Sequence, residues 1–491
     1  MDSLKTTNAD AGRRAGDGEH VTGHAGEISA LLLARDDPRP VHFTGIAGAG
    51  MSALAELLAH RGVPVQGSDS NPNGAPDLEA LGIVVTAHDA TRVAAARALV
   101  YSSAITATHP EIEAARAAGI PVIRRAEALA AAVAGGTLVG IAGTHGKTTT
   151  TVLTAAALTS AGRNPTAVVG GRVREWKGNL RPGGRTAVVE ADEYDRSFLA
   201  LYPEVAVVLN IEADHLDIYE NLSDILQTFG VFASRAATVI VCADDEGAGK
   251  LHLTGSHNVI GYTANTDEAA ASHAQLNARL RAEDIVLERE GSHFTVTFDA
   301  VTLGEVTLSV PGLHNVRNAL AAIGVGLSLG CTLAEMTPGL RSFHGVERRF
   351  QRIATLSGID IVDDYAHHPT EIRATIAAAR QAFPGRRLVI AFQPHLYSRT
   401  RDLHREFGEA LAAADAVFLC DIYPAREAPI AGVSSALIGQ HLAGKLLWQG
   451  ARAEAAAALC KSVRSGDAVL TMGAGDITRV GPDLLSLLSH E

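Results

Sequence analysis

The segment GIAGTHGKTTT, at residues 140–150, contains the residue types that bind the phosphates of a nucleotide. The usual phosphate loop reads G-x-x-x-x-G-K-[ST]. Gly146, Lys147 and Thr148 match the end of that pattern, whereas Ile141 stands where its first glycine belongs. Backbone N–H groups in such a loop form an anion nest, the lysine suits the β- and γ-phosphates, and the threonine hydroxyl suits Mg2+. The strand before the loop and the helix after it favour an ATP site over a chance Gly-Lys-Thr turn.

Two acidic segments follow this loop, each directly after an apolar strand. The first, VVEADEYDRSF, has Glu190 at its strand end, where a carboxylate that holds nucleotide-bound Mg2+ commonly lies. Such an ion takes only one or two protein carboxylates plus water, so Glu190 is the first choice. The second, VLNIEADHLD, contains His215. We expect His215 to bind a second divalent ion or a substrate, because ligands of α/β sheets bind beyond the strand ends. The alternative is a structural histidine.

Another glycine loop, GIAGAG, lies nearer the N-terminus and carries Gly45, Gly48 and Gly50. Its spacing differs from the dinucleotide pattern G-x-G-x-x-G. Glycines still let the backbone approach a phosphate, and the helix that follows attracts one to its N-terminus. Asp69, roughly 20 residues further on, stands where an acidic residue commonly binds a ribose. We expect phosphate binding here, with a tight turn packed on the sheet as the alternative.

Strands alternate with helices in three segments, which predicts parallel α/β sheets. A chain of 491 residues also exceeds one hydrophobic core, on a prior of roughly 150 residues per domain. The segment SHFTVTFDAVTLGEVTLSVPG alternates with period two and predicts antiparallel strands added to the central domain. We therefore expect a disordered extension at 1–37 and domains at 38–133, 134–342 and 343–491.

Four apolar strands are predicted in the last domain: IDIV, RLVIAF, AVFLC and AVLTM. A polar cluster follows each of them: DDYAHH, QPHLYSR, DIYPARE and GAGD. Because ligands bind beyond the carboxyl ends of such strands, the clusters are expected to converge on one crevice. His368 precedes Pro369, which suits a first helical turn. His368 is therefore expected to cap a helix while His367 points elsewhere.

Composition and charge exclude several classes of protein. The net charge of -12 argues against non-specific binding to nucleic acid or to anionic membranes. No apolar run reaches ~18 residues, so no membrane span is expected, and the N-terminus lacks the apolar region of a secretory signal. The four cysteines form no C-x-x-C pair, so we expect reduced thiols in a cytoplasmic protein. The sequence does not distinguish a monomer from a dimer.

Eight motifs occur in one order along the chain: GIAGAGMSALAELL, GTHGKTTT, EADEYDRSF, DHLDIY, GLHNVRNA, VDDYAHHPTEI, FQPHLYSRT and MGAGD. Together they resemble the Mur ligases of peptidoglycan synthesis, from about residue 38 to about residue 485. The altered phosphate loop, G-T-x-G-K-T, is the family's own version. The histidine in GTHGKT and the DDYAHHPTE motif resemble the branch that adds L-alanine, or its relative that attaches whole peptides. The segment DIYPAREAPIAGVS favours the alanine-adding branch.

The resemblance implies a three-domain α/β fold. Its parts are a Rossmann-like N-terminal domain, a P-loop ATPase-like central domain with added antiparallel strands, and a Rossmann-like C-terminal domain, which bind UDP-sugar, ATP and amino acid respectively. The implied UDP-sugar residues are Gly45, Gly48, Gly50 and Asp69. The implied ATP residues are Gly143, Thr144, His145, Gly146, Lys147, Thr148 and Thr149, with His314 and Asn318 at the adenine. The implied amino-acid residues are Tyr365, His367, His395 and Arg399, and the implied ligands of two Mg2+ ions are Thr148, Glu190 and His215.

The resemblance also implies a reaction. The carboxylate of UDP-N-acetylmuramate attacks the γ-phosphate of ATP, and the amine of L-alanine then attacks the acyl phosphate. Lys147 would neutralise the charge that builds up in the first step, and His215 and His367 are candidate bases for the amine. Many relatives have a basic residue after the histidine of QPH, where this chain has Leu396, so a role for that residue is not carried over. Two alternatives stay open, a ligase of a recycled tripeptide and a nucleotide-binding ATPase without ligase chemistry.

Overall fold

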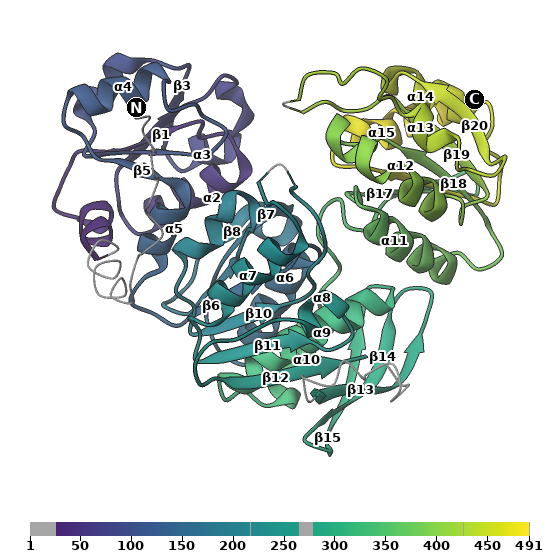
Figure 1. Cartoon of the computed structure of the whole chain (residues 1–491), viewed down its shortest axis with the longest axis horizontal. Coiled ribbons are helices and arrows are strands. Elements are labelled where there is room, and N and C mark those ends of the chain that lie inside the picture. Colours follow the sequence, from purple (N-terminus) through teal and green to yellow (C-terminus); the bar gives the residue numbers. More distant parts are fainter. Residues whose placement is uncertain (1–25, 217, 265–277, 426, 491) are drawn as a thin grey trace, which may run out of the picture. The chain divides into compact units, whose positions relative to one another are not determined.

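The computed structural model of the chain describes residues 26–216, 218–264, 278–425 and 427–490 (Figure 1). Its contacts divide it into two compact units, Met1–Gly136 and Thr137–Glu491. The first unit contains a five-stranded sheet, and the second contains a ten-stranded and a six-stranded sheet. The expected α/β class is confirmed, with one sheet in each of the three expected domain ranges.

The sheet of the first unit has the strand order β3-β2-β1-β4-β5, and all its pairs are parallel. This is the order of a doubly wound nucleotide-binding fold, in which the chain reverses direction beside the first strand. The strands are β1 (Val41–Thr44), β2 (Val65–Ser68), β3 (Val84–Thr86), β4 (Ala98–Tyr101) and β5 (Val122–Arg124). The helices are α2 (Ala49–His60), α3 (Pro76–Ala80), α4 (Pro110–Ala117) and α5 (Arg125–Val133).

The expected extension at 1–37 is shorter than the sequence suggested. Residues 26–33 are helical, and the side chain of Leu32 is fully buried. The buried guanidinium of Arg97 donates hydrogen bonds to the carbonyls of Leu32, at 3.1 Å, and Ala34, at 2.5 Å. The described part of the extension therefore packs within the first unit, because its apolar side chains are buried there. Residues 1–25 lie outside the described residues.

The central sheet has the order β15-β14-β13-β12-β11-β10-β6-β9-β7-β8. Strands β14 and β15 pair antiparallel, as the period-two pattern predicted, and Figure 1 shows them with β13 at one end of the sheet. The strands are β6 (Leu138–Ala142), β7 (Thr166–Val173), β8 (Gly178–Arg181), β9 (Ala187–Glu190), β10 (Val205–Val208), β11 (Thr238–Cys242), β12 (Asn258–Thr263), β13 (Ala278–Leu287), β14 (Ser292–Phe298) and β15 (Val301–Leu308). The helices are α6 (Lys147–Ser160), α7 (Leu222–Ala233), α8 (Glu246–Gly249), α9 (Leu313–Ser328) and α10 (Leu333–Arg341).

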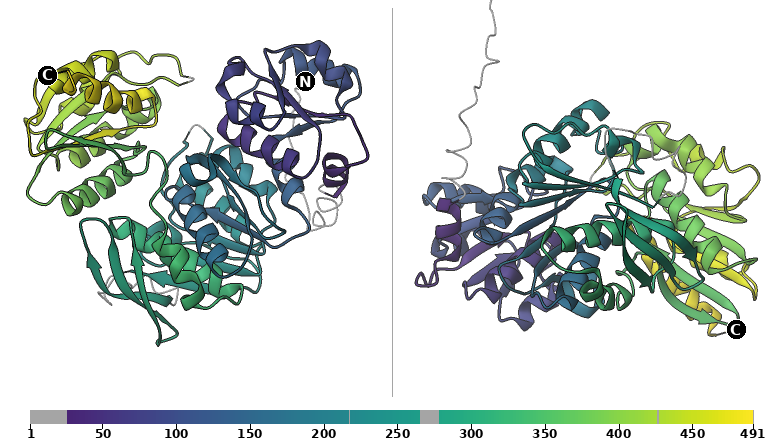
Figure 2. Two further views of the ribbon diagram at one scale, coloured as in Figure 1. Left: turned by 180° about the vertical axis from the view of Figure 1, so that it is seen from behind. Right: turned by 90° about the horizontal axis from the view of Figure 1, so that it is seen from below.

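Helices cover both faces of this sheet, as its edge-on view in Figure 2 shows. Val139 and Ile141 of β6 join the core cluster that includes residues of α6 and α9. The intervening Gly140 faces the other way, where a Cβ atom would lie 2.9 Å from the ring of Phe232 on α7. Alternate residues of a strand point to opposite faces, so a strand buried on both faces is apolar at every position. That burial fixes the end of β6, from which the phosphate loop starts.

The third sheet has the order β16-β17-β21-β18-β19-β20 and is parallel except for the pair of β16 with β17. Helices α11 and α12 lie in the core on one face, and α14 and α15 in the core on the other. The strands are β16 (Gln351–Leu356), β17 (Ile359–Asp364), β18 (Arg387–Phe392), β19 (Ala416–Cys420), β20 (Leu446–Gly450) and β21 (Asp467–Met472). The helices are α11 (Pro369–Ala382), α12 (Tyr397–Leu411), α13 (Ala436–Gly439), α14 (Arg452–Cys460) and α15 (Val480–Leu488).

The four strands predicted in this domain are β17, β18, β19 and β21, and the two edge strands were missed. Residues of β16 and β20 are only partly buried, so neither strand has the continuous apolar run of a central parallel strand. Among the residues that the structure describes, no helix is both long and apolar enough to cross a bilayer.

Candidate functional site

Gly143 and Gly146 shape the phosphate loop, which explains why its sequence departs from the usual motif. Gly143 has a φ of 153° and Gly146 a φ of 83°, a backbone region that side chains disfavour. A Cβ atom at 143 would lie 2.9 Å from the Leu209 side chain, and one at 146 would lie 2.9 Å from Asn318 Oδ1. Helix α6 begins directly after Gly146, and the N–H groups of its first turn lack intrahelical partners. The loop therefore offers anion-binding N–H groups at the end of β6.

Asn210 braces this loop from the segment that follows β10. Its Oδ1 accepts a hydrogen bond from the backbone N–H of His145 at 2.7 Å, and its Nδ2 donates to the carbonyl of His145 at 3.1 Å. The backbone N–H of Thr144 donates to the carbonyl of Asn210 at 3.1 Å, and Thr144 Oγ1 accepts from Glu212 N at 2.9 Å. These bonds hold Thr144 and His145 in one conformation, so the nest exists before any ligand enters.

Lys147 is held inside the loop by a carboxylate that the sequence analysis did not single out. Its Nζ donates to the carbonyl of Gly143 at 2.7 Å and to the Glu193 carboxylate at 2.7 and 2.9 Å. Burial lowers the pKa of Lys147, but the negative charge of Glu193 outweighs it and the net pKa is raised. Burial raises the pKa of Glu193, and the positive charge of Lys147 brings it below its usual value. Lys147 is therefore a permanent cation at the loop.

Thr148 and Glu190 lie together, as a shared Mg2+ site requires. Thr148 Oγ1 donates to Glu190 Oε2 at 2.9 Å, and the backbone N–H of Gly170 donates to the same oxygen at 2.7 Å. A hydroxyl and a carboxylate are the oxygen ligands that Mg2+ prefers. These two residues fit the ion that the sequence pattern implies.

His215, the third predicted metal ligand, contacts other acidic groups. It has a φ of 54° at the start of a turn, and its Nε2 lies 3.6 Å from Glu193 Oε1 and 3.9 Å from Asp214 Oδ2. Burial lowers its pKa, but Glu193 and Asp214 raise it above the usual value overall. Glu193 thus links His215 to Lys147, and a ligand role for His215 stays a prediction.

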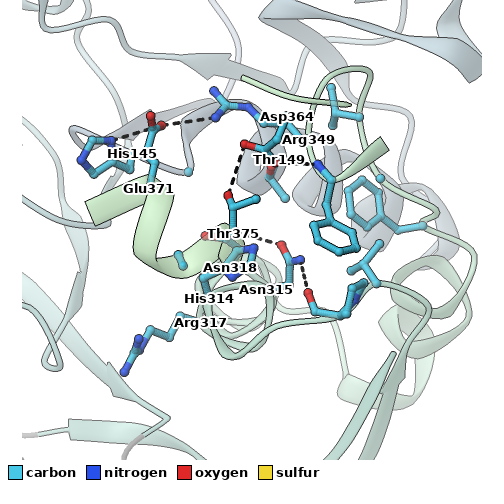
Figure 3. A pocket seen from close by; sticks show the side chains of 18 of the residues that line it. His145, Thr149, His314, Asn315, Arg317, Asn318, Arg349, Asp364, Glu371 and Thr375 are labelled. Atoms are coloured by element: carbon cyan, nitrogen blue, oxygen red, sulfur yellow. Dashed lines mark hydrogen bonds and ion pairs between the residues drawn. The ribbon is translucent and has the colours of Figure 1, made fainter. Parts of the chain in front are cut away.

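A cavity of about 830 Å³ lies beside the phosphate loop (Figure 3). This volume is in the range of cofactor and nucleotide pockets. The predicted ATP residues that line it are His145, Gly146, Thr149, His314 and Asn318. Apolar side chains line it as well, including Leu209, Tyr262, Val310, Phe343 and Phe350. The flat, largely apolar nucleobase of a nucleotide fits such a lining, and polar groups of α9 would orient it.

His314 and Asn318 are placed at the start of α9, on the wall of this cavity. Asn318 Oδ1 accepts from Thr150 Oγ1 at 3.2 Å, and its Nδ2 donates to Asn315 Oδ1 at 3.3 Å. Burial and the positive charge of Arg317 lower the pKa of His314 to about 4. A neutral imidazole at physiological pH can both donate to and accept from the edge of a base. Their role at the adenine stays a prediction.

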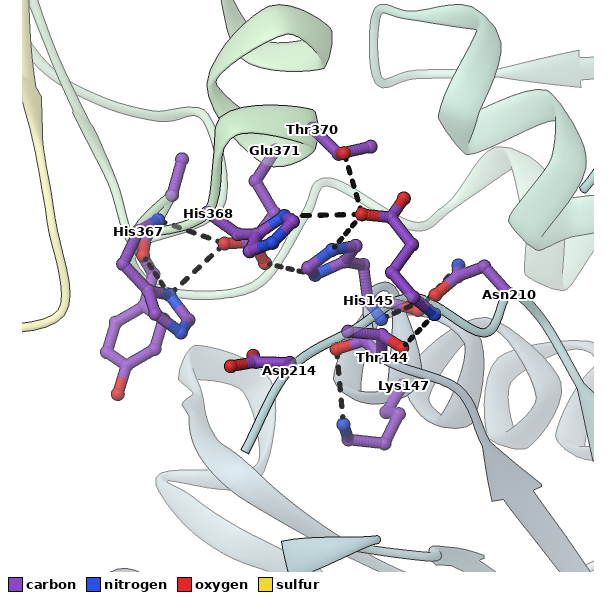
Figure 4. A network of polar contacts seen from close by, with 12 residues as sticks. Thr144, His145, Lys147, Asn210, Asp214, His367, His368, Thr370 and Glu371 are labelled. Atoms are coloured by element: carbon purple, nitrogen blue, oxygen red, sulfur yellow. Dashed lines mark hydrogen bonds and ion pairs between the residues drawn. The ribbon is translucent and has the colours of Figure 1, made fainter. Parts of the chain in front are cut away.

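Glu371, on the first turn of α11, joins the phosphate loop to the C-terminal domain (Figure 4). Its carboxylate lies 3.3 Å from His145 Nδ1, 3.1 Å from His367 Nδ1 and 3.3 Å from Arg349 Nη1. Burial raises the pKa of Glu371, but the charges of His367 and His145 bring it well below its usual value. Burial likewise lowers the pKa of His145, and Glu371 and Glu212 raise it to about 9.

His368 does not cap α11, contrary to the prediction. It occupies the N-cap position before Pro369, but its Nδ1 lies 3.3 Å from Glu212 Oε2. The ring therefore points at the central domain's acidic segment rather than at the helix N–H groups. Burial lowers the pKa of His368 to about 4, with the charge of His145 as the next cause.

Three of the four predicted amino-acid residues gather in a row of rings. Tyr365 meets His367 edge to face at 5.2 Å between centroids, and His367 meets His395 at 6.1 Å. His395 stacks on Tyr423 at 5.7 Å. Arg349 and Arg348 both lie over the Tyr365 ring, at 5.1 and 4.9 Å. The clusters after β17, β18 and β19 thus converge, as expected for strand ends of an α/β sheet.

The fourth predicted residue, Arg399, reaches across to the acidic segment of the central domain. Its Nη2 donates to Asp214 Oδ1 at 2.6 Å, and both side chains are at least nine-tenths buried. Burial raises the pKa of Asp214, and Arg399, His215 and His367 together bring it well below its usual value. Asp214 therefore lies within electrostatic reach of both candidate bases, although they belong to different domains.

The first glycine loop belongs to the other unit and has its own bracing. Asp69 Oδ2 accepts from the backbone N–H of Ala47 at 3.0 Å, and its Oδ1 accepts from Asn71 N at 2.9 Å. Helix α2 begins at Ala49, so Gly50 is helical instead of ending the turn. A Cβ atom at Gly50 would lie 2.8 Å from the guanidinium of Arg125. Asp69 shapes the loop here, while sugar-nucleotide binding by these residues stays a prediction.

Five residues of the site were assigned no individual role in the sequence analysis. They are Glu193, Asn210, Glu212, Glu371 and Tyr423. Each lies in a polar segment directly after a strand or at a helix start, which was the available signal. Their partners are far away in the chain, so the spacing of residues did not reveal the pairs.

Models of one protein family match three successive segments that make up most of the chain. "Mur ligase family, catalytic domain" matches residues 40–137, "Mur ligase middle domain" matches 141–326, and "Mur ligase, glutamate ligase domain" matches 348–475.

Individual relatives point to one branch. UDP-N-acetylmuramate–L-alanine ligase of Burkholderia cenocepacia strain J2315 is 43% identical over 92% of this chain and 98% of that protein. The enzyme of that name from Streptomyces coelicolor is 43% identical over 94% of this chain and 99% of its own. The crystal structure of UDP-N-acetylmuramate-alanine ligase from Thermotoga maritima has a TM-score of 0.76 at 28% identity, over 92% of this chain and 99% of that one.

We predict that Asn210→Ala weakens ATP binding about tenfold or more. The two side-chain hydrogen bonds that brace His145 contribute about 1 kcal/mol each, and their loss frees the loop. Titration calorimetry with a non-hydrolysed ATP analogue measures the effect. Asn221→Ala is the matched control, because it removes the N-cap of α7 and costs about 1 kcal/mol of stability without touching the loop. Equal affinities in the two variants would contradict the bracing role.

We predict that His145 makes the protein less stable as pH rises through about 9. The folded pKa lies above the unfolded value, so the folded state binds more protons between about 6.5 and 9 and its unfolding free energy falls across that window. The groups facing the ring are Glu212, Glu371 and His368. Thermal unfolding in EDTA between pH 7 and 10 should show a steeper decline for the natural protein than for His145→Gln. Parallel curves would refute the charged state of His145.

Proposed function

The chain belongs to the Mur ligase family, and from that membership and the site we propose that it ligates L-alanine to UDP-N-acetylmuramate in an ATP-dependent reaction. The observation that carries the proposal is the contact of Glu371 with both His145 and His367. It joins the phosphate loop to the ring cluster after the C-terminal strands. A nucleotide site and a second polar site that share side chains suit a transfer between two substrates, and a simple nucleotide switch has no need of the second site.

The first step would activate the carboxylate of the sugar nucleotide. That carboxylate attacks the γ-phosphorus of ATP, the bond to the β-phosphate oxygen breaks, and an acyl phosphate and ADP result. Two anions approach each other in this step, so fixed positive charge is the main requirement. Lys147 and the N–H groups of the loop supply it. Mg2+ bound by Thr148 and Glu190, with a second ion near His215, would add charge neutralisation.

The second step would form the amide. The amine of L-alanine attacks the acyl carbon, a tetrahedral intermediate forms, and inorganic phosphate leaves. Arg348 and Arg349 flank the Tyr365 ring and are paired with Asp363 and Glu371, so each would attract an amino-acid carboxylate only by exchanging its partner. Arg399 is neutralised by Asp214 in this structure, so it would act on the amino acid only by exchanging that partner.

The amine must lose a proton before it attacks, and we assign this role to His367 rather than His215. Glu371 orients the His367 ring through Nδ1, at 3.1 Å, which leaves Nε2 to accept a proton. His215 lies between Glu193 and Asp214 and is the implied ligand of the second ion. A ring nitrogen that holds a metal ion is not free to accept the amine's proton.

The tripeptide ligase is the second candidate, because its acceptor also presents an amine. Release of phosphate from ATP and UDP-N-acetylmuramate distinguishes the candidates when either L-alanine or the tripeptide is added. We predict release that depends on L-alanine. A preference for the tripeptide would support the second candidate, and release that ignores both acceptors would contradict ligase chemistry.

We predict that Lys147→Ala lowers turnover by at least about 100-fold, as removal of a charge-stabilising group does. The substitution also leaves buried Glu193 without its cation, which destabilises the fold. The double variant Lys147→Ala/Glu193→Gln should regain stability while turnover stays low. Lys250→Ala is the control, since Lys250 pairs with Glu246 on the surface. Turnover near the natural rate in the double variant would show that the loop has been misassigned.

A further inference from the structure

Three side chains from separate segments converge beside the phosphate loop, and Figure 4 labels the two histidines among them. They are His145 of the loop, Glu212 after β10, and His368 before α11. One potential ligand atom from each lies within 4.8 Å of the other two. Glu212 Oε2 is 3.6 Å from His145 Nε2 and 3.3 Å from His368 Nδ1. This cluster is separate from Thr148 and Glu190, the pair suited to Mg2+.

The two ring nitrogens that face Glu212 are buried without a hydrogen bond. His145 Nε2 and His368 Nδ1 make none with any residue that the structure describes. A buried polar atom without a partner costs on the order of 1–3 kcal/mol, so such atoms call for an explanation. Both nitrogens lie beside one carboxylate oxygen, and a cation at this point would satisfy all three atoms.

A second layer of contacts orients these ligands as in known metal sites. His145 Nδ1 lies 3.3 Å from Glu371 Oε1, so that carboxylate holds the ring by its other nitrogen. Thr370 Oγ1 donates to Glu212 Oε2 at 2.7 Å. Metal-binding histidines almost always donate their second N–H to a carboxylate, carbonyl or water, and ligating carboxylates are hydrogen-bonded in turn.

The ligand set selects the kind of ion. Two imidazoles and one carboxylate, with an open fourth position, are typical of Zn2+ and related transition metals. Mg2+ prefers six oxygen ligands in a near-ideal octahedron, so it would not compete well here. The cluster therefore differs from a phosphate-bound Mg2+ site in chemistry as well as in position.

We propose that His145, Glu212 and His368 form a binding site for a transition-metal dication of the Zn2+ type, which tethers the phosphate loop to the start of α11. The bound ion takes the place of the direct contacts of Glu212 with His145 and His368. It joins the central and C-terminal domains at the loop that binds phosphate. The site depends on neither the acceptor nor the reaction assigned above.

Zn2+ and Co2+ binding to the full-length, EDTA-treated protein tests the proposal. We expect one Zn2+ per chain to be withdrawn from a chromophoric chelator, and Co2+ to give the intense visible absorption of four-coordinate sites. Glu212→Gln and His368→Gln should each weaken Zn2+ binding by more than about tenfold, and Thr370→Val by about tenfold. Thr370→Ser keeps the hydroxyl and should bind Zn2+ as the natural protein does.

Two variants test for competing histidine sites. His404→Gln removes one ring of the His404–His441 pair, whose nitrogens are 3.2 Å apart, and His60→Gln removes a ring that lies 3.7 Å from a Glu56 carboxylate oxygen. Both should leave Zn2+ affinity unchanged. Loss of Zn2+ binding in either of them, natural affinity in Glu212→Gln and His368→Gln, or a Co2+ spectrum of the octahedral aqua ion would overturn the proposal. Because binding is measured without nucleotide or substrate, the outcome is independent of the ligase assignment.

Discussion

The carboxylate of Glu371 is the interaction on which the arrangement of the site depends. It is buried, yet it stays ionised because His145, His367 and Arg349 surround it. A buried charge persists only when it is paired and hydrogen-bonded. One anion on the first turn of α11 thus fixes a histidine of the phosphate loop and a histidine of the ring cluster. Removal of that anion would leave Arg349 and the two histidine rings without the carboxylate that holds them together.

The same logic extends to the phosphate loop as a whole. Lys147 is paired with Glu193, and Thr148 with Glu190, before any phosphate enters. An incoming triphosphate brings further negative charge to a region already rich in carboxylates. Divalent cations neutralise the negative charges of the carboxylates and phosphates. We therefore expect metal binding and nucleotide binding to be coupled. The hydrogen bond to Asn210 orders the loop in advance. Less conformational entropy is therefore lost when the ligand binds.

Much of the fold could be predicted from local patterns, and much of the site could not. Strands such as β6 and β18 are apolar at nearly every position because both faces are covered, and this left a clear signal. The edge strand β20 has exposed positions, so its sequence lacks the continuous burial pattern that reveals a central strand. Gly143 and Gly146 lie at the turns their residue type suggested. The pairs Lys147–Glu193 and His368–Glu212 join segments far apart in the chain, and only the packing of the sheets brings them together.

The central claim is that the phosphate loop and the C-terminal cluster together join a carboxylate to an amine through an acyl phosphate. The most direct measurement uses UDP-N-acetylmuramate labelled with oxygen-18 in its carboxylate, together with ATP and L-alanine. Each turnover should transfer one labelled oxygen to inorganic phosphate, because that oxygen bridges the acyl carbon and the phosphorus in the intermediate. Phosphate without label, released together with amide product, would contradict the account.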